Sequence, residues 1–372
     1  MRQVGVERDV FFWTAYMKAK IVFEDGRIFE GNSFGASGER CGEVVFNTSM
    51  TGYQEIITDP SYKGQIVAMT YPLIGNYGVN DEDVESRRPF LEGFIVKELC
   101  RVSSNWRAKT TLGEYFKQNN IMGVQGVDTR AITRHIRLAG AMKAVISDQD
   151  LDDQSLVKKA KASCGLNGID MVEKVVVDAP YQWNKAGKFH VVAIDCGIKY
   201  NILRQLVALD CKLTVVPYSF SHEKILGYKP DGLFLSNGPG DPACVKYVAN
   251  NVKQLMGKLP ILGICLGHQM LGLALGGTTY KLKFGHHGAN HPVKDLRNGK
   301  IAITSQNHGY CVDINSLNKD DVEMTHVNLN DNTLEGMRHK KLPVASVQYH
   351  PEAGPGPHDS HYLFEEFIGM MK

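Results

Sequence analysis

The sequence lacks the features that mark several classes of protein. Its 42 Lys and Arg residues nearly balance 40 Asp and Glu residues, so no basic surplus favours nucleic acid or an anionic membrane surface. No apolar run reaches the roughly 20 residues that a membrane-spanning helix needs. No G-x-x-x-x-G-K-[ST] run is present, which argues against a P-loop for ATP. We therefore expect a chain that binds neither nucleic acid nor a membrane.

Two further features bear on where the protein works. The eight cysteines show no paired spacing such as C-x-x-C, and a chain of 372 residues needs no disulfides to supplement its core. The apolar stretch DVFFWTAYM follows Arg2 and Arg8, as in an export signal, but it is short and no small-residue cleavage site follows. We expect a cytoplasmic location and a peripheral extension over residues 1–17, with Met17 as the alternative start.

The next part of the chain, residues 18–150, is expected to form a small, β-rich α+β domain. An Asp-Gly pair in KIVFEDGRIFEG separates two alternating apolar runs, which predicts a β-hairpin. One helix is predicted over 111–120 and another after Asp128 or Thr129, ending at Gly140. Residues 151–187 are expected to be a linker with one short helix, because DAPYQWNKAGK has no hydrophobic period.

Residues 188–372 alternate apolar strands with amphipathic helices. FHVVAIDCG, KLTVVPYS, DGLFL and PILGIC read as strands, and helical segments separate them. This alternation predicts an α/β fold, a mostly parallel sheet wrapped by helices. Functional loops in such a sheet gather at the carboxyl ends of the strands.

A candidate nucleophile lies where one predicted strand meets a helix. Gly263-Ile264-Cys265-Leu266-Gly267 has the G-x-nucleophile-x-G pattern of a tight strand-to-helix turn. A helix N-terminus favours a thiolate, and its free N–H groups can hold an oxyanion. A buried structural cysteine beside two packing glycines is the alternative.

A candidate base and its orienting partner follow another predicted strand, VASVQY. In extended chain, His350 and Glu352 point to the same side, and Pro351 biases His350 away from helix. We expect them at the sheet edge where Cys265 lies. A surface His–Glu pair is the alternative.

Two polar segments are expected at the same edge. SNGPGDP, residues 236–242, predicts a rigid loop with exposed backbone amides, although a simple turn would have the same composition. SQNHGY, residues 305–310, supplies Asn307 and Gly309 and reads as another strand exit.

GICLGHQ together with the late YHPE resembles the class I, triad-type glutamine amidotransferases over residues 188–372. FNTSMTGYQEIITDPSYKGQIV, YPLIGNYGVN, VQGVDTRAITRHIR, FGHHGANHPV and ITSQNHGY resemble the family of carbamoyl-phosphate synthase small chains. The resemblance covers nearly the whole chain after Met17.

This resemblance implies a role for each matching position. The catalytic triad would be Cys265, His350 and Glu352. Tyr310 stands where many relatives carry Phe. The implied glutamine-binding residues are Ser49, Gly238, Gly240, Leu266, Gln269, Asn307, Gly309 and Tyr310.

The resemblance also implies the reaction and the partner. The chain would hydrolyse L-glutamine and deliver ammonia to a large synthetase subunit, which would use ATP and Mg²⁺ to make carbamoyl phosphate for arginine or pyrimidine synthesis. No cofactor is expected in this chain. A stand-alone γ-glutamyl hydrolase and a regulatory subunit without turnover remain alternatives.

Two further clusters have weaker interpretations. His286, His287 and His291 could bind zinc by residue type, but the family segment implies structural or subunit-facing histidines, so no metal is expected. Arg130, Arg134 and Arg137 share one predicted helix face, which we expect to be solvated or to contact a subunit.

Overall fold

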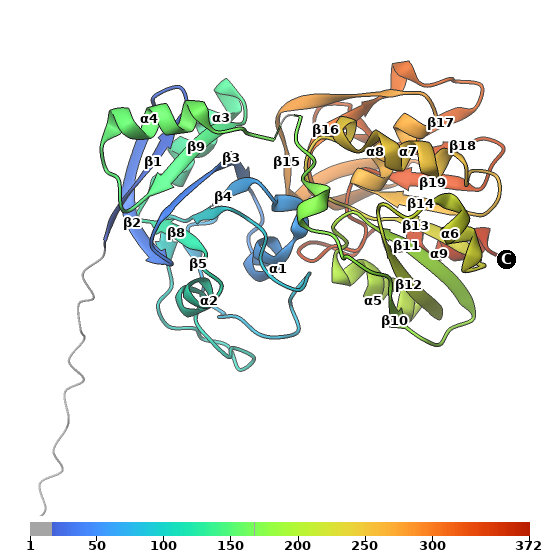
Figure 1. Cartoon of the computed structure of the whole chain (residues 1–372), viewed down its shortest axis with the longest axis horizontal. Coiled ribbons are helices and arrows are strands. Elements are labelled where there is room, and N and C mark those ends of the chain that lie inside the picture. The colour runs from blue at the N-terminus through green and yellow to red at the C-terminus, as the bar shows by residue number, and fades with distance from the viewer. Residues whose placement is uncertain (1–16, 167) are drawn as a thin grey trace, which may run out of the picture.

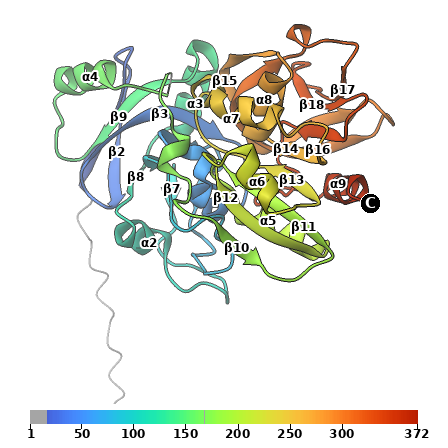
Figure 2. The ribbon, with the colours of Figure 1, turned by 45° about the vertical axis from the view of Figure 1, so that its right-hand side comes forward.

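The computed structural model describes residues 17–166 and 168–372 and places two domains side by side (Figure 1). The expected extension therefore lies, except for Met17, outside the described residues. The terminal helix α9 (Tyr362–Met370) lies at the end of the molecule remote from α4 (Asp153–Ala162), as Figure 1 and Figure 2 both show. In the part of the chain that the structure describes, no helix is long and apolar enough to cross a membrane.

The N-terminal domain is a closed barrel with the strand order β1-β2-β8-β6-β4-β3-β9. Its strands are β1 (Lys18–Phe23), β2 (Ile28–Gly35), β3 (Glu39–Asn47), β4 (Gln65–Met69), β6 (Gly93–Ile95), β8 (Met122–Gln125) and β9 (Met142–Ser147). Outside the barrel, β5 (Leu73–Ile74) pairs with β7 (Glu98–Leu99). The helices are α1 (Tyr53–Thr58), α2 (Leu112–Gln118), α3 (Thr129–Ala139) and α4.

Local sequence signals account for several of these elements. The predicted hairpin is confirmed, because β1 pairs antiparallel with β2 across the Asp25-Gly26 turn. The predicted caps of α3 are confirmed too: the Asp128 carboxylate accepts from the Ala131 N–H, and Gly140 ends the helix with φ 105°. Alternate strand residues such as Ile21 and Ile66 pack with Ile132 of α3 in one buried cluster.

The second domain is built on a ten-stranded sheet with the order β10-β12-β11-β13-β14-β19-β18-β17-β15-β16. Its strands are β10 (Tyr181–Asn184), β11 (Phe189–Asp195), β12 (Cys211–Pro217), β13 (Gly232–Leu235), β14 (Ile261–Ile264), β15 (Thr278–Asp295), β16 (Ile301–Asp313), β17 (Val322–Asn328), β18 (Leu334–His339) and β19 (Val344–Val347). Its helices are α5 (Tyr200–Ala208), α6 (His222–Gly227), α7 (Lys246–Lys253), α8 (Leu266–Ala274) and α9.

The centre of this sheet confirms the predicted α/β fold. Strands β12, β11, β13, β14 and β19 run parallel. Helices α7 and α8 pack into one buried cluster and α5 and α9 into another, so both faces of the sheet are covered. Beyond β19 the sheet continues through four antiparallel strands, β18, β17, β15 and β16, which the sequence did not reveal.

Two sequence interpretations were wrong. The supposed linker 178–188 contains β10, an edge strand that pairs antiparallel with β12. Packed and exposed side chains alternate over only a few residues of β10: Tyr181 and Trp183 pack against the cluster that contains α5, while Gln182 between them is exposed. The segment 305–310 is not a strand exit but the middle of β16, where a polar sequence is buried because its side chains find partners inside the protein.

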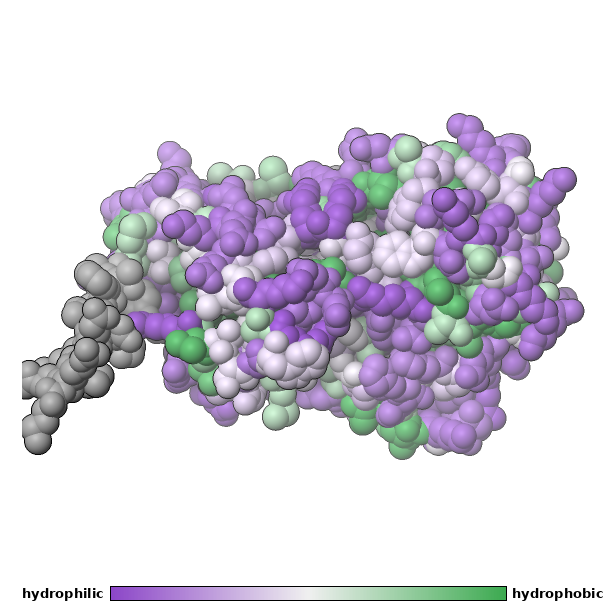
Figure 3. All heavy atoms as spheres, turned by 90° about the horizontal axis from the view of Figure 1, so that it is seen from below, coloured by the Kyte–Doolittle hydropathy of each residue, from purple (hydrophilic) through white to green (hydrophobic). Residues whose placement is uncertain are grey.

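The long strand β15 of the second domain packs against the barrel domain. Its residues pack against β3 and α3 of the barrel domain, and backbone bonds run from Thr48 N to His287 O and from Ala141 N to Lys283 O. Figure 1 shows β15 between the two domains. The face drawn in Figure 3 is largely hydrophilic, and its apolar residues are scattered over it.

Candidate active site

Cys265 occupies the turn between β14 and α8, as the glycine pattern predicts. Its φ of 54° is unusual for a residue with a side chain, and such strain gathers at functional sites. A Cβ on Gly263 would lie 2.7 Å from the Gly267 backbone, and one on Gly267 would lie 2.2 Å from the Leu235 carbonyl oxygen. Both positions therefore need glycine.

The structure brings Cys265, His350 and Glu352 together. The Cys265 N–H donates to Val347 O at 2.9 Å, which ties the turn to the strand that precedes His350. His350 Nδ1 lies 2.6 Å from Glu352 Oε1, and all three side chains are buried. His350 Nε2 has no hydrogen-bond partner in the described structure and is thus available for proton transfer.

Charge interactions set the protonation of this group. Burial alone would lower the pKa of His350, but the Glu352 carboxylate and Cys265 outweigh it and raise the pKa to about 10. Burial alone would raise the pKa of Glu352, but Lys199 and then His350 hold it at about 2. At neutral pH the imidazole carries a proton and the carboxylate is ionised.

Lys199 is a member of this site that the sequence analysis missed. Its Nζ lies 3.0 Å from Glu352 Oε1 and 2.5 Å from the Ala353 carbonyl oxygen, and its side chain is 2% exposed. Burial opposes its charge, yet carboxylates led by Glu352 keep the pKa of Lys199 above its usual range. The available signal was a lysine just beyond an apolar strand that ends at the same sheet edge.

A cavity beside Cys265 contains most of the predicted glutamine-binding residues. The predicted residues that line it are Gly238, Gly240, Gln269, Asn307, Gly309 and Tyr310. Leu266 is the residue after Cys265 and is buried beside it. The remaining predicted residue, Ser49, lies in a loop of the barrel domain, 3% exposed, and its hydroxyl lacks a hydrogen-bond partner among the described residues. Such an orphaned hydroxyl fits a contact to a polar ligand.

Hydrogen bonds fix several side chains around this cavity. Asn307 Nδ2 donates to Asp59 Oδ2 of the barrel domain at 2.8 Å, and its Oδ1 lies 3.0 Å from His287 Nδ1. Gln269 Nε2 donates to Tyr310 O at 2.9 Å. His287 also lines the cavity, although the sequence analysis gave it only a structural or subunit-facing role. Both domains therefore shape the site.

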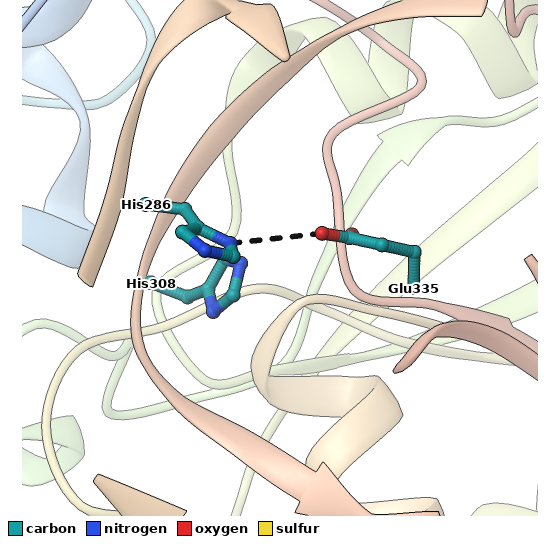
Figure 4. Close-up of side chains that lie close together, drawn as sticks. All are labelled: His286, His308 and Glu335. Carbon is teal, nitrogen blue, oxygen red and sulfur yellow. Dashed lines mark ion pairs between the residues drawn. The ribbon is translucent and has the colours of Figure 1, made fainter. Parts of the chain in front are cut away.

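One cluster has the side chains of a metal site. Ligand atoms of His286, His308 and Glu335 lie within 4.8 Å of one another. His286 Nδ1 lies 3.6 Å from Glu335 Oε1, and Figure 4 shows this ion pair. The other nitrogen of His286 lies 2.8 Å from Asp331 Oδ2. Burial alone would lower the pKa of His286, but these two carboxylates raise it to about 9. Because both nitrogens of His286 face a carboxylate, we interpret this cluster as a buried ion pair, in which a metal ion would have to displace the proton of the imidazole.

The predicted arginine face is not part of the site. Arg130, Arg134 and Arg137 are exposed on α3, at the barrel.

Comparisons with known proteins match this two-domain layout. The model for glutamine amidotransferase class-I matches residues 192–370, and that for the carbamoyl-phosphate synthase small chain, CPSase domain, matches residues 21–146. The carbamoyl phosphate synthase small chain of Syntrophotalea carbinolica is 57% identical over 370 residues, covering 96% of this chain and 98% of the relative. That of Aquifex aeolicus is 55% identical over 367 residues, covering 95% and 99%. The chloroplastic small chain of Oryza sativa subsp. japonica is 53% identical over 368 residues, covering 95% and 82%.

Proposed function

The chain belongs to the family of carbamoyl-phosphate synthase small chains, and from this premise we propose that Cys265, His350 and Glu352 carry out its hydrolysis of glutamine. As a small chain with a class I amidotransferase domain, it is the glutamine-hydrolysing subunit of the synthase. The observation that supports the triad best is the buried contact between His350 and Glu352 beside the strained Cys265 turn.

The first half of the reaction releases ammonia. The Cys265 thiolate attacks the carboxamide carbon of glutamine, and the N–H groups of Leu266 and Gly240 donate hydrogen bonds to the oxyanion that forms. His350 holds a proton at neutral pH because its pKa is raised, so it can protonate the amide nitrogen as the C–N bond breaks. The products of this half are ammonia and a γ-glutamyl thioester.

The second half restores the enzyme. His350, now neutral, removes a proton from water, which attacks the thioester carbonyl. Glutamate leaves and the thiolate forms again, with the proton back on His350. Glu352 stays ionised throughout and holds the imidazole by its Nδ1, and Lys199 holds Glu352.

Substrate binding is assigned to residues of both domains. The glutamine-binding set is Ser49, Gly238, Gly240, Leu266, Gln269, Asn307, Gly309 and Tyr310. The cavity beside Cys265 and the unpartnered Ser49 hydroxyl support this set. Gly240 has a φ of 88°, so its loop can turn backbone N–H groups toward a bound oxyanion.

Membership of the family implies a large-subunit partner. We assign ATP, Mg²⁺ and the synthesis of carbamoyl phosphate to that partner, which receives the ammonia. We also propose a cytoplasmic location, which the eight free cysteines support.

The test is a Cys265→Ser variant of the assembled synthase, with Cys41→Ser, an exposed cysteine, as control. The serine hydroxyl stays protonated near neutrality, so glutamine-dependent synthesis should fall by roughly two or more orders of magnitude. Synthesis from added ammonium salt should survive, because free ammonia bypasses this step. Persistence of glutamine-dependent synthesis would exclude Cys265 as the nucleophile. Loss of both activities would make the residue structural.

A further inference from the structure

We propose that Glu85, a residue of the barrel domain, is a positioning residue for the triad, because it holds the first turn of α5, which in turn holds Glu352. This inference rests on the proposed triad. It gives the barrel domain a part in the chemistry beyond its contact with glutamine.

The first turn of α5 depends on Glu85 for its cap. A helix begins with N–H groups that have no partner inside the helix. Within the described structure, the N-cap residue Lys199 makes no side-chain cap, since its ammonium points to the triad. Glu85 supplies the missing acceptors: its carbonyl oxygen accepts from Tyr200 N at 2.9 Å, and its Oε2 accepts from Asn201 N at 2.9 Å. The barrel domain therefore caps a helix of the other domain.

The capped turn reaches Glu352 by two routes. Asn201 Nδ2 donates to the Glu352 carbonyl oxygen at 2.5 Å, which fixes the backbone of the triad carboxylate. Lys199, directly before this turn, fixes the Glu352 side chain. A shift of the first turn of α5 would move both contacts together.

Glu85 is itself held firmly. It is 2% exposed, and its N–H donates to Thr58 Oγ1 of α1 at 2.9 Å. Arg204, one turn further along α5, lies 3.3 Å from Glu85 Oε1 and donates to the carbonyl oxygens of Glu82 and Val84, each at 3.0 Å. The carboxylate is thus bonded at both oxygens, and its own backbone is anchored to the barrel domain.

Charge connects Glu85 to the site as well. Its burial raises the pKa of its carboxyl group to about 7, and Lys199 is the strongest of the groups that oppose this rise. Lys199 in turn lies in the field of Glu352, Glu85 and Asp59. One buried lysine is therefore shared between the triad and two carboxylates of the barrel domain.

The experiment compares Glu85→Ala and Glu85→Gln in the assembled synthase, with Glu82→Gln as control. Glu82 is a near neighbour whose side chain is 82% exposed, so its change should leave all activities as they are. Alanine removes the acceptor for Asn201 N–H, and we expect kcat for glutamine hydrolysis to fall by roughly tenfold or more, as misplaced catalytic groups do. The KM for glutamine should stay within about twofold, because the glutamine contacts lie elsewhere.

Two further measurements separate positioning from general stability. The Gln side chain at position 85 retains an acceptor oxygen, so Glu85→Gln should keep most of the wild-type kcat. Ammonia-dependent synthesis should be unchanged in every variant. Asn201→Ala cuts the same route to Glu352, so the double variant Glu85→Ala/Asn201→Ala should lose less than the product of the two single losses. If Glu85→Ala fails to assemble, kcat and ammonia-dependent synthesis of Glu85→Gln and Asn201→Ala test the inference in its place.

Three results would overturn the inference: an unchanged kcat in Glu85→Ala, a parallel loss of ammonia-dependent synthesis, or full multiplicativity in the double variant. Cys265→Ser measured beside them tells the two proposals apart. If Cys265→Ser abolishes glutamine use while Glu85→Ala does not affect it, the triad stands and only the role of Glu85 falls.

Discussion

The turn at Cys265 can be tested by adding a single methyl group. Gly267 is the second residue of α8, and its N–H donates to Ser236 O at 3.0 Å, directly beyond the end of β13. A Cβ built on Gly267 lies 2.2 Å from Leu235 O and 2.8 Å from both the carbonyl carbon and the Cβ of Leu235. In Gly267→Ala the main chains of α8 and β13 must therefore separate.

The size of the effect follows from these distances. Real Cβ atoms keep about 3.0 Å or more from such an oxygen, so the two backbones must part by roughly 0.8 Å. Forced overpacking of this kind costs about 1–3 kcal/mol of stability. The same shift displaces Cys265 and the Leu266 N–H, and a misplacement near 1 Å can cost about 100-fold in rate. We expect kcat for glutamine hydrolysis to fall by about that factor, and Gly267→Val to be worse.

The assay needs a control for the substitution itself. Gly369 lies in α9, and a Cβ there would meet no atom within 4 Å, so Gly369→Ala should keep full activity and gain up to about 1 kcal/mol of helix stability. Glutaminase kcat and thermal unfolding are measured for both variants, with ammonia-dependent synthesis of the assembled enzyme as a check on assembly. A Gly267→Ala enzyme with near-normal kcat would refute the close contact and the role of the turn.

Two further predictions concern charge. Because the pKa of His350 is raised from 6.5 to about 10, its protonation stabilises the folded state fully below pH 6.5, and this stabilisation is lost as the pH rises towards 10. Because the pKa of Glu352 is lowered from 4.5 to about 2, its ionisation stabilises the folded state above pH 4.5, and this stabilisation is lost as the pH falls towards 2. The difference in melting temperature between the wild-type chain and His350→Gln should therefore be largest between these windows and shrink at alkaline pH; a difference that grows with pH would contradict the raised pKa. For the His286 cluster, dialysis against a chelator should leave glutaminase activity and melting temperature unchanged, whereas a loss that added zinc restores would show that His286, His308 and Glu335 hold a metal.

Local signals explain why much of the fold was predictable. Hairpin and helix caps depend on residues that are adjacent in sequence, as Asp25-Gly26 and Asp128 show. The Cys265 turn belongs to the same class, because a crowded strand-to-helix turn demands glycine on both sides. Its context was confirmed, while the catalytic roles of the triad remain a prediction.

The two wrong predictions from the sequence fall on segments whose side-chain polarity does not indicate their place in the sheet. The middle of β16 is polar and was interpreted as a strand exit. Asn307 and His308 are buried there because partners from β15, from the barrel domain and from their own strand satisfy them. Strand β10 is too short to show a clear period, and only its place at the sheet edge makes Tyr181 and Trp183 strand residues. No local pattern contains the identity of such partners.

Lys199 and Glu85 show the same limit at the site itself. In the sequence, Lys199 lies 153 residues before Glu352, and Glu85 lies 116 residues before Asn201, from whose N–H it accepts a hydrogen bond. A lysine beside a strand and a glutamate in a polar loop are ordinary surface residues until folding buries both, and an isolated buried charge is too costly to persist without a partner. Their burial is thus the evidence for their pairing, and that pairing ties the barrel domain to the triad. It follows that the amidotransferase domain alone, although it contains Cys265, His350 and Glu352, lacks the cap that holds α5 and the two barrel-domain carboxylates near Lys199, those of Glu85 and Asp59.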